Sequence, residues 1–400
     1  MTKEEMIKDL KNVKLVIGNG YDLHCGLKSS YADFFMRDVS KNNYFNKWLD
    51  EFKEKINQND FGAEQSKEDV WVEFKNIDKL NIWDLFFYIE TKTTNQNNKE
   101  ALLWCDIETV MYNSLKSYDS REENTNLFTW EYVYKVINKE MQANFDCFEV
   151  YVMAKVILEK RNKEGFKNID EFYYYILDEL NQFEKEFGKF INKKRYPYGA
   201  FLPGMPNSSF EKYSKTTLQE LCNEDNLVSI DSFNYDDIGD DNLNKLLHNI
   251  NGNLENPIFG IDSNLCRASD PRFIFTKTNR RMELEMIDFE CQKDIAFDNV
   301  IVYGHSLSSN DYSYFFPLLD KLEMTNFLSN KKIIFGFSVY DREKETEIKR
   351  KNRLNIQKLF EAYANYKGLK DVNRLLDSLT TQNRVLTYEI RTFENYFYSL

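Results

Sequence analysis

The residues best suited to bind a nucleotide lie in the segment Gly18-Asn19-Gly20-Tyr21-Asp22, with Gly26 shortly after it. A short apolar run, residues 13–17, ends directly before this segment. Glycine lets the backbone approach a phosphate closely, and the N–H groups at the start of a following helix attract anions. The segment therefore predicts a phosphate cradle after a buried strand. A tight turn without a ligand would use the same glycines, so both interpretations stay open.

A second polar segment, Ser232-Phe233-Asn234-Tyr235-Asp236, follows the apolar run 226–233. Asn234 has two interpretations. Its amide could orient a ribose hydroxyl or a water molecule, or it could cap the next helix, as Asn and Asp often do at such positions.

A third segment, from Gly304-His305-Ser306 to Asp311, follows the apolar run 299–303. Its backbone N–H groups and hydroxyls could donate hydrogen bonds to a nucleotide. Asp311 could accept hydrogen bonds from ribose hydroxyls, or it could cap a helix that begins at Tyr312. His305 is compatible with a catalytic role and with a purely structural one.

The elements that must position these segments are short strands that alternate with helices. Apolar runs predict strands at 13–17, 226–233, 257–261, 299–303, 332–339 and 384–390, with a charged helix at 342–366. This alternation predicts an α/β fold with a Rossmann-like, doubly wound and mostly parallel sheet. Ligands of such sheets bind beyond the carboxyl ends of the strands, where all three segments fall.

Residues 31–220 follow a different, helical pattern. Apolar residues recur in steps of three or four from Ile169 to Phe190, and acidic and basic residues lie at the ends that suit the helix dipole. Further helices are predicted at 31–52, 70–90, 101–115 and 131–158, and a proline-containing loop at 196–206. The predicted organisation is an α/β nucleotide-binding domain of residues 1–30 and 221–400, interrupted by a helical insertion domain of residues 31–220.

Composition narrows the function classes. The 400 residues carry a net charge of −12, which argues against nucleic acid as a partner because that would need a basic surface. Arg280-Arg281 and Lys193-Lys194-Arg195 are predicted to be solvated surface rather than a phosphate grip. The six cysteines show no Cys-x-x-Cys spacing and there are three histidines, so no metal site is expected. A polar start and the lack of a long apolar run predict no membrane association and a cytoplasmic location.

In this order along the chain, the segments resemble the AbiH family of bacterial phage abortive-infection proteins. The resemblance runs from residue 14 to about residue 340 and rests on Gly18-Asn19-Gly20-Tyr21-Asp22-Leu23, Gly26-Leu27, Tyr31-x-x-Phe34, Trp104-Cys105-Asp106-Ile107-Glu108, Ser232-Phe233-Asn234-Tyr235, Ile258-Phe259-Gly260-Ile261-Asp262 and Gly304-His305-Ser306-Leu307 with Asp311. The family assignment implies a role in anti-phage defence, with a phage-encoded trigger.

More distantly, the same segments are similar to the sirtuin-type NAD-binding fold. This resemblance implies NAD as ligand or substrate. It implies that Gly18, Asn19, Gly20 and Asp22 line the phosphates and that Asn234 is the functional asparagine. Gly304, Ser306 and Asp311 would form the adenosine-side block, and Gly26 and His305 are further candidate cofactor-binding residues.

The chain departs from its relatives before the segment Ile258–Asp262. Asn251 stands where relatives have a histidine, and His248 lies three residues upstream. An imidazole titrates near neutral pH and an amide does not. Either His248 substitutes as the base, or the chain lacks a general base there.

Three functions are compatible with these features. The first is an NAD glycohydrolase that is triggered by infection. The second is a nucleotide-binding sensor or scaffold without turnover, whose aromatic helical lobe contacts a partner or forms a homo-oligomer. The third is a nuclease that uses Asp106 and Glu108 to hold Mg²⁺, although residues two apart lie on different faces of a helix.

Overall fold

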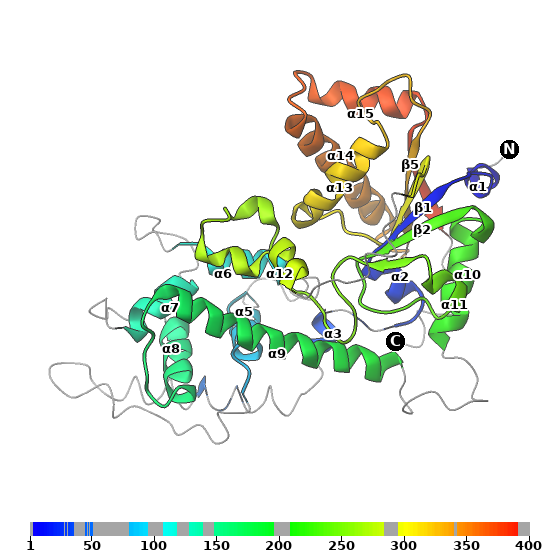
Figure 1. Ribbon diagram of the computed structural model, residues 1–400. Helices are drawn as coiled ribbons and strands as arrows, with labels where there is room; N and C mark the ends of the chain where they lie inside the picture. The colour runs from blue at the N-terminus through cyan, green and yellow to red at the C-terminus, as the bar shows by residue number, and fades with distance from the viewer. Residues whose placement is uncertain are drawn as a thin grey trace. The chain divides into compact units, whose positions relative to one another are not determined.

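The computed structural model describes residues 3–27, 29, 31–35, 45, 47, 49–50, 80–94, 107–117, 128–138, 148–195, 209–283, 295–339 and 342–390 (Figure 1). The chain divides into two compact units. The first combines Met1–Ser29 with Lys185–Leu400, and the second is Ser30–Glu184. The helical region of the second unit thus ends at Glu184, whereas the sequence pattern placed its end at residue 220.

A parallel sheet forms the centre of the first unit. Within the described residues it has the six strands β1 (Val13–Ile17), β2 (Leu227–Ser232), β3 (Leu247–Asn249), β4 (Asn299–Tyr303), β5 (Lys332–Ser338) and β6 (Val385–Ile390). Their order is β3-β2-β1-β4-β5-β6, and each neighbouring pair is parallel. This is the order of a doubly wound Rossmann-like sheet, and it confirms the predicted α/β class.

The sequence pattern misplaced one strand. The predicted strand 257–261 is wrong, because the described residues there form only isolated bridges, Gly252 with Pro257 and Ile261 with Thr276. Pro257 has no N–H for a ladder, and the backbone of Ile261 bonds to the carbonyl of Phe275 instead. The third strand on that side is β3, whose mixed three-residue sequence Leu-His-Asn carries no apolar run.

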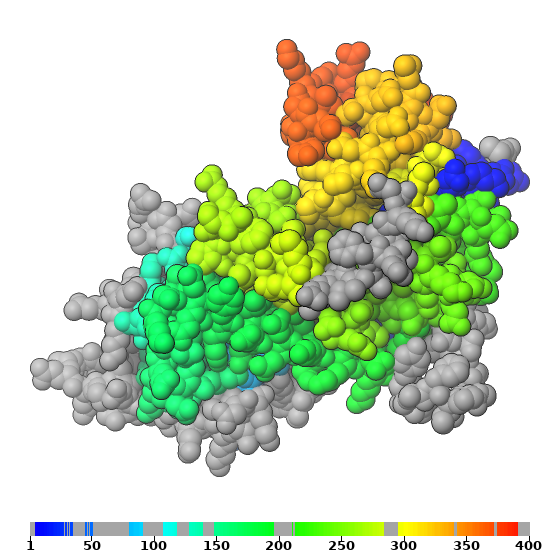
Figure 2. Space-filling view, in the orientation of Figure 1, coloured from blue at the N-terminus to red at the C-terminus, as the bar shows by residue number. Residues whose placement is uncertain are grey.

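Helices cover both faces of the sheet. Helices α13 (Tyr312–Lys321), α14 (Glu345–Tyr366) and α15 (Val372–Thr381) cover one face (Figure 1), and their side chains pack in one core with Val16, Val302 and Phe335 of the strands. In Figure 2 the segments from β4 onward form one continuous body of yellow to orange-red atoms. Helices α2 (Asn19–His24) and α10 (Ser209–Leu221) lie on the other, where the Tyr21 hydroxyl contacts Ser214 Oγ at 2.7 Å. The first unit is therefore a three-layer α/β/α structure.

Short helices occupy the connections of the first unit. They are α1 (Lys3–Lys8), η3 (Glu224–Asn226), α11 (Asp241–Asn244), η4 (Ser263–Leu265), η5 (Pro271–Phe275), α12 (Lys277–Glu283) and η7 (Ser309–Asp311).

The regular secondary structure of the second unit's described residues is helical, and its core contains many aromatic rings in contact. Its helices are α3 (Tyr31–Phe35), α5 (Ile82–Thr94), α6 (Ile107–Leu115), α7 (Trp130–Ile137), α8 (Phe148–Lys160) and the first part of α9 (Ile169–Arg195). The rings of Trp83 and Trp130 lie 5.2 Å apart in its core. The prediction of α9 is confirmed, and the prediction of one helix over 131–158 is wrong, because α7 ends at its C-cap Asn138. The predicted loop 196–206 lies outside the described residues.

Candidate functional site

The three predicted segments meet at the carboxyl edge of the sheet. Gly18 N donates to the carbonyl of Tyr303 at 3.0 Å, and Gly20 N donates to that of Gly304 at 2.8 Å. Phe233 N donates to the carbonyl of Ile17 at 2.8 Å. The ends of β1, β2 and β4 are thereby joined at the point where the strand order reverses, which is where ligands of doubly wound sheets bind.

The glycines are required by the contact between the β1 and β4 loops. An added Cβ on Gly20 would lie 2.7 Å from Gly304 Cα, and one on Gly18 would lie 2.8 Å from the Gly304 oxygen. Gly304 has φ +67°, and its Cβ would lie 2.3 Å from Tyr21 N. Loop-to-loop packing therefore explains these glycines without a ligand. The phosphate cradle stays a prediction.

The other members of the first segment have separate positions. Gly26, with φ +83°, follows the end of α2, where its N–H donates to the carbonyl of Leu23 at 3.0 Å. Asn19 is exposed, and its Oδ1 accepts a hydrogen bond from Ser29 Oγ at 2.7 Å. Of the residues predicted to line phosphates, Asp22 is the most deeply placed side chain, at 4% exposure.

Asn234 ties the β2 loop to the β1 loop. Its Nδ2 donates to Asp22 Oδ1 at 2.7 Å and to the carbonyl of Gly18 at 3.2 Å. The prediction that it caps the next helix is wrong, because α11 is capped by Asp240, whose side chain accepts from the N–H groups of Asn242 and Leu243. Asn234 therefore acts as a brace between Gly18 and Asp22.

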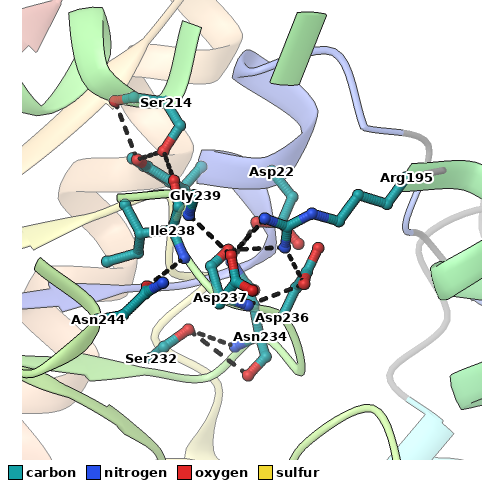
Figure 3. Close-up of polar contacts among 11 residues, drawn as sticks. Asp22, Arg195, Ser214, Ser232, Asn234, Asp236, Asp237, Ile238, Gly239 and Asn244 are labelled. Carbon is teal, nitrogen blue, oxygen red and sulfur yellow. Dashed lines mark hydrogen bonds and ion pairs between the residues drawn. The ribbon is translucent and has the colours of Figure 1, made fainter. Parts of the chain in front are cut away.

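Asp236 and Arg195 complete a buried cluster around Asp22 and Asn234, called here the β2-side cluster (Figure 3). Arg195 Nη1 pairs with Asp236 Oδ1, and both side chains are 2% exposed or less. Asp236 Oδ1 also accepts from Asp237 N at 2.8 Å. Asp236 Oδ2 is buried and has no hydrogen-bond partner among the described residues.

Burial raises the pKa of both carboxyls in this cluster. The pKa of Asp22 lies well above its ordinary value of 3.8 because of burial and, secondly, the nearby Asp236. Burial raises the pKa of Asp236 to about 6, although Arg195 opposes the shift. A carboxyl with such a pKa can exchange a proton near neutral pH, which is what acid–base catalysis requires.

The segments Arg280-Arg281 and Lys193-Lys194-Arg195 were predicted to be solvated surface, and this prediction is wrong for Arg195 and Arg280, which are buried. Arg195 ends α9 but turns into the β2-side cluster, and Arg280 is 3% exposed and donates to the carbonyl of Phe259 at 3.2 Å. Arg281 donates to the carbonyl of Ile250 at 2.8 Å. The one sequence signal for Arg195 is Asp236, because a carboxylate that is buried after a strand needs a cation; its neighbour Asp237 is exposed.

A second group, called here the β4-side cluster, consists of Lys277, His305 and Asp311. Lys277 Nζ lies 2.7 Å from Asp311 Oδ1, and His305 Nε2 lies 3.4 Å from Asp311 Oδ2. His305 Nδ1 accepts from Leu307 N at 2.9 Å, which leaves Nε2 as the protonated nitrogen facing Asp311. Both ring nitrogens thus have partners within the protein.

Asp311 serves this cluster rather than a helix end. It occupies the N-cap position of α13, but its side chain makes no capping hydrogen bond to the described residues, so the capping prediction is wrong. Burial raises its pKa, but Lys277 and His305 outweigh burial, and the pKa lies below its ordinary value. Ser306 is exposed, and its carbonyl accepts from Asn355 Nδ2 of α14 at 2.9 Å.

The structure does not bring His248 to Asn234. His248 lies on β3, paired with Asp231, and its Nδ1 is 3.8 Å from Asp231 Oδ1. Asp231 accepts from the Tyr314 hydroxyl of α13 at 2.5 Å, so this group faces α13, opposite to α2. Asn251 contacts the residue directly before Asn234: its Nδ2 donates to the carbonyl of Phe233 at 3.2 Å. The buried Oδ1 of Asn251 has no partner among the described residues.

The metal-dependent alternative depends on Asp106 and Glu108. Glu108 is buried on α6, and Asp106 lies outside the described residues. In the part of the chain that the structure describes, no three His, Cys, Asp or Glu side chains are grouped to hold a metal ion. The same part contains no helix with the length and apolar character needed to cross a bilayer.

Comparisons of the chain with protein-family models, with curated proteins and with solved structures found no match. The structural evidence on function is therefore the sheet topology and the two clusters at its carboxyl edge.

Proposed function

We propose that the first unit binds NAD or a closely related nucleotide at the carboxyl edge of its sheet and hydrolyses the nicotinamide–ribose bond, as an infection-triggered effector of anti-phage defence. The observation that carries the proposal is the meeting of the β1, β2 and β4 loops at the reversal of strand order, beside a buried carboxyl with an unused oxygen. The resemblance to AbiH and sirtuin-type proteins supplies the choice of ligand. In this proposal the protein acts in the cytoplasm and responds to a phage component.

The reaction needs few protein groups. The bond electrons leave with nicotinamide, which departs as a neutral base, and an oxocarbenium-like ribose remains. Water adds to this carbon and loses a proton. Asp236 Oδ2 is the group suited to accept that proton, because its pKa of about 6 leaves it ionised at neutral pH. Asn234 and Asp22 position the loops around it.

A second candidate is a nucleotide sensor without turnover. It is favoured by the position of Asn251, whose amide cannot act as a base, and by the commitment of Asn234 Nδ2 to Gly18 and Asp22. In this case the nucleotide would bind intact and the helical unit would contact a partner or a second copy.

The test is the NAD content of infected cells that carry the wild-type protein, Asp236→Asn, Asn234→Ala or Asp241→Asn. Asp241 is an exposed carboxylate five residues after Asp236 and serves as the matched control. We expect NAD to fall with the wild type and Asp241→Asn and to hold with the other two. Protection without loss of NAD in the wild type would reject the hydrolase and favour the sensor.

A further inference from the structure

Helix α9 belongs to both units. It runs without interruption for 27 residues from Ile169 to Arg195, and the division between the units falls at Glu184 and Lys185. Its first half packs inside the second unit, where Trp83 Nε1 donates to the carbonyl of Ile176 at 3.0 Å.

The last turns of α9 lie against the loops of the β2-side cluster. The ring of Phe187 lies 5.1 Å from that of Tyr235 and 5.0 Å from that of Phe259. A Cβ on Gly188 would lie 2.0 Å from the Leu254 oxygen, so the helix backbone is in direct contact with the turn after β3. This packing fixes where the end of α9 can place Arg195.

Arg195 grips the Asp236 loop with both of its terminal nitrogens. Nη1 pairs with Asp236 Oδ1 and donates to the carbonyl of Asp237 at 3.0 Å, while Nη2 pairs with Asp237 Oδ1. The guanidinium also lies 5.1 Å over the ring of Phe210. Figure 3 shows the guanidinium directed at both carboxylates, with Asp22 on the adjacent helix.

We propose that Arg195 is a positioning residue for Asp236: from the end of α9 it holds Oδ1 in place and leaves Oδ2 as the oxygen that can take up or release a proton. The inference rests on the proposed function for its consequence in catalysis.

The two carboxylate oxygens of Asp236 differ in their hydrogen bonds, and this difference is the reason to assign Arg195 more than a structural role. Asp236 Oδ1 accepts from Arg195 and from Asp237 N, whereas Oδ2 accepts from none of the described residues. An unmade buried hydrogen bond is costly, so a buried carboxylate oxygen without a partner is a candidate for a role beyond the ion pair. The charged groups that act on Asp236 are Arg195, which lowers its pKa, and Asp237, which raises it; Asp22 is the other buried carboxyl of the cluster.

The first experiment follows the carboxyl of Asp236 directly. The full chain, with ¹³C-labelled aspartate, is titrated by NMR, and Asp236→Asn assigns the signal. We expect the pKa of Asp236 to rise by at least about one unit in Arg195→Met, because the guanidinium no longer favours the ionised form, and by less in Arg195→Lys, which keeps the charge. Arg280→Lys, at another buried arginine, should leave the titration unchanged.

An unchanged titration in folded Arg195→Met would overturn the proposal. Where that variant does not fold, Arg195→Lys decides with the same measurement, because lysine cannot reproduce the two-nitrogen grip. The pH profile of NAD hydrolysis should shift in the same direction as the titration, and a titration shift without a profile shift also overturns the positioning role. A wild type that leaves NAD intact rejects the proposed function, while the titration still tests the grip.

The dependence on α9 has its own test. Lys185 is exposed on α9 at the division between the units, so Lys185→Pro interrupts the helix there without altering Arg195, and Lys185→Ala is the matched control. We expect the proline variant to shift the Asp236 titration toward that of Arg195→Met and the alanine variant to match wild type. A folded proline variant with the wild-type titration would show that the continuity of α9 does not position Arg195 on the carboxyl of Asp236.

Discussion

The β2-side and β4-side clusters lie at the same edge of one sheet and use the same kinds of residues, yet they are in opposite electrostatic states. In the β4-side cluster, Lys277 and His305 hold the pKa of Asp311 below its ordinary value despite burial. In the β2-side cluster, burial keeps the pKa of Asp22 and Asp236 raised, and Asp236 Oδ2 is unused by the described residues. Polar residues at a strand end are therefore not equivalent: in one cluster the charges compensate each other within the protein, and in the other a buried carboxyl keeps a raised pKa and one oxygen without a partner among the described residues.

The largest expected effect comes from breaking the contact that joins the two clusters. Gly304→Ala places a Cβ 2.3 Å from Tyr21 N, and a backbone clash cannot be relieved by a rotamer change. We expect this variant to lose most of the ~5–15 kcal/mol that holds a typical domain folded, and to fail to fold. Expression and circular dichroism provide the measurement.

Gly368→Ala is the matched control for backbone strain. Gly368 has the same φ of +67°, but an added Cβ meets no atom of the described residues within 4 Å. We expect a loss of only about 1 kcal/mol, the usual cost of a left-handed alanine. Equal losses in the two variants would show that strain, and not the contact between loops, accounts for Gly304.

The next effect concerns the fully paired cluster. Lys277→Met leaves the carboxylate of Asp311 buried without its closest cation, and breaking such a pair costs about 3–5 kcal/mol. Urea unfolding at pH 7 measures the loss. The double variant Lys277→Met with Asp311→Asn should recover part of it, because the unpaired charge is gone. No recovery would mean that the lysine stem, rather than its charge, stabilises this region.

The contrast between the clusters also shows which features a sequence can reveal. The runs at 13–17, 299–303 and 332–339 are long and apolar enough to predict buried strands, and parallel strands place their following loops at one edge. The meeting of Gly18, Asn234 and Gly304 could therefore be anticipated. What each side chain does there could not be, since Arg195 and Asp236 are 41 residues apart and meet only through the fold.

Predictions from neighbouring residues in the sequence were wrong where contacts between distant residues determine the position of a side chain. Basic residues at a helix end are usually solvated, but Arg195 is buried because two aspartates lie opposite it. Asp311 stands where a helix cap belongs, yet Lys277 draws its carboxylate away. β3 escaped prediction because three residues with one apolar member carry no periodicity.

The two clusters should give stability with opposite pH dependence. The pKa of Asp236 is about 6 in the folded protein, against an ordinary value of 3.8. Its contribution to the free energy of unfolding is therefore complete below about pH 4 and is lost as the pH rises through 6. Two pKa units correspond to about 3 kcal/mol. Asp22, whose pKa is also raised, adds to the loss as the pH rises. Asp311 has a lowered pKa, so its contribution is complete at neutral pH and is lost as the pH falls below about 4.

Urea unfolding of wild type, Asp236→Asn and Asp311→Asn between pH 3 and pH 8 separates the two signs. In Asp236→Asn, the free energy of unfolding should fall less than in wild type as the pH rises from 4 to 6. In Asp311→Asn, it should fall less than in wild type as the pH drops below about 4. Curves for Asp236→Asn that run parallel to wild type through this window would contradict the electrostatic distinction between the clusters.

The smallest effect is expected outside both clusters, at His248. This side chain is 29% exposed, and its Nδ1 lies 3.8 Å from Asp231 Oδ1, whereas the less exposed Lys14 places its Nζ 2.8 Å from Asp231 Oδ2. His248→Gln should therefore change the free energy of unfolding by less than about 1 kcal/mol, against a larger loss for Lys14→Met at the same carboxylate. Because His248 faces α13 while Asn234 bonds to α2, the variant should also leave the infection-induced fall of NAD unchanged. Loss of that fall in a protein of wild-type stability would place the missing base on β3 and would make the β2-side cluster a support for it rather than the centre of the reaction.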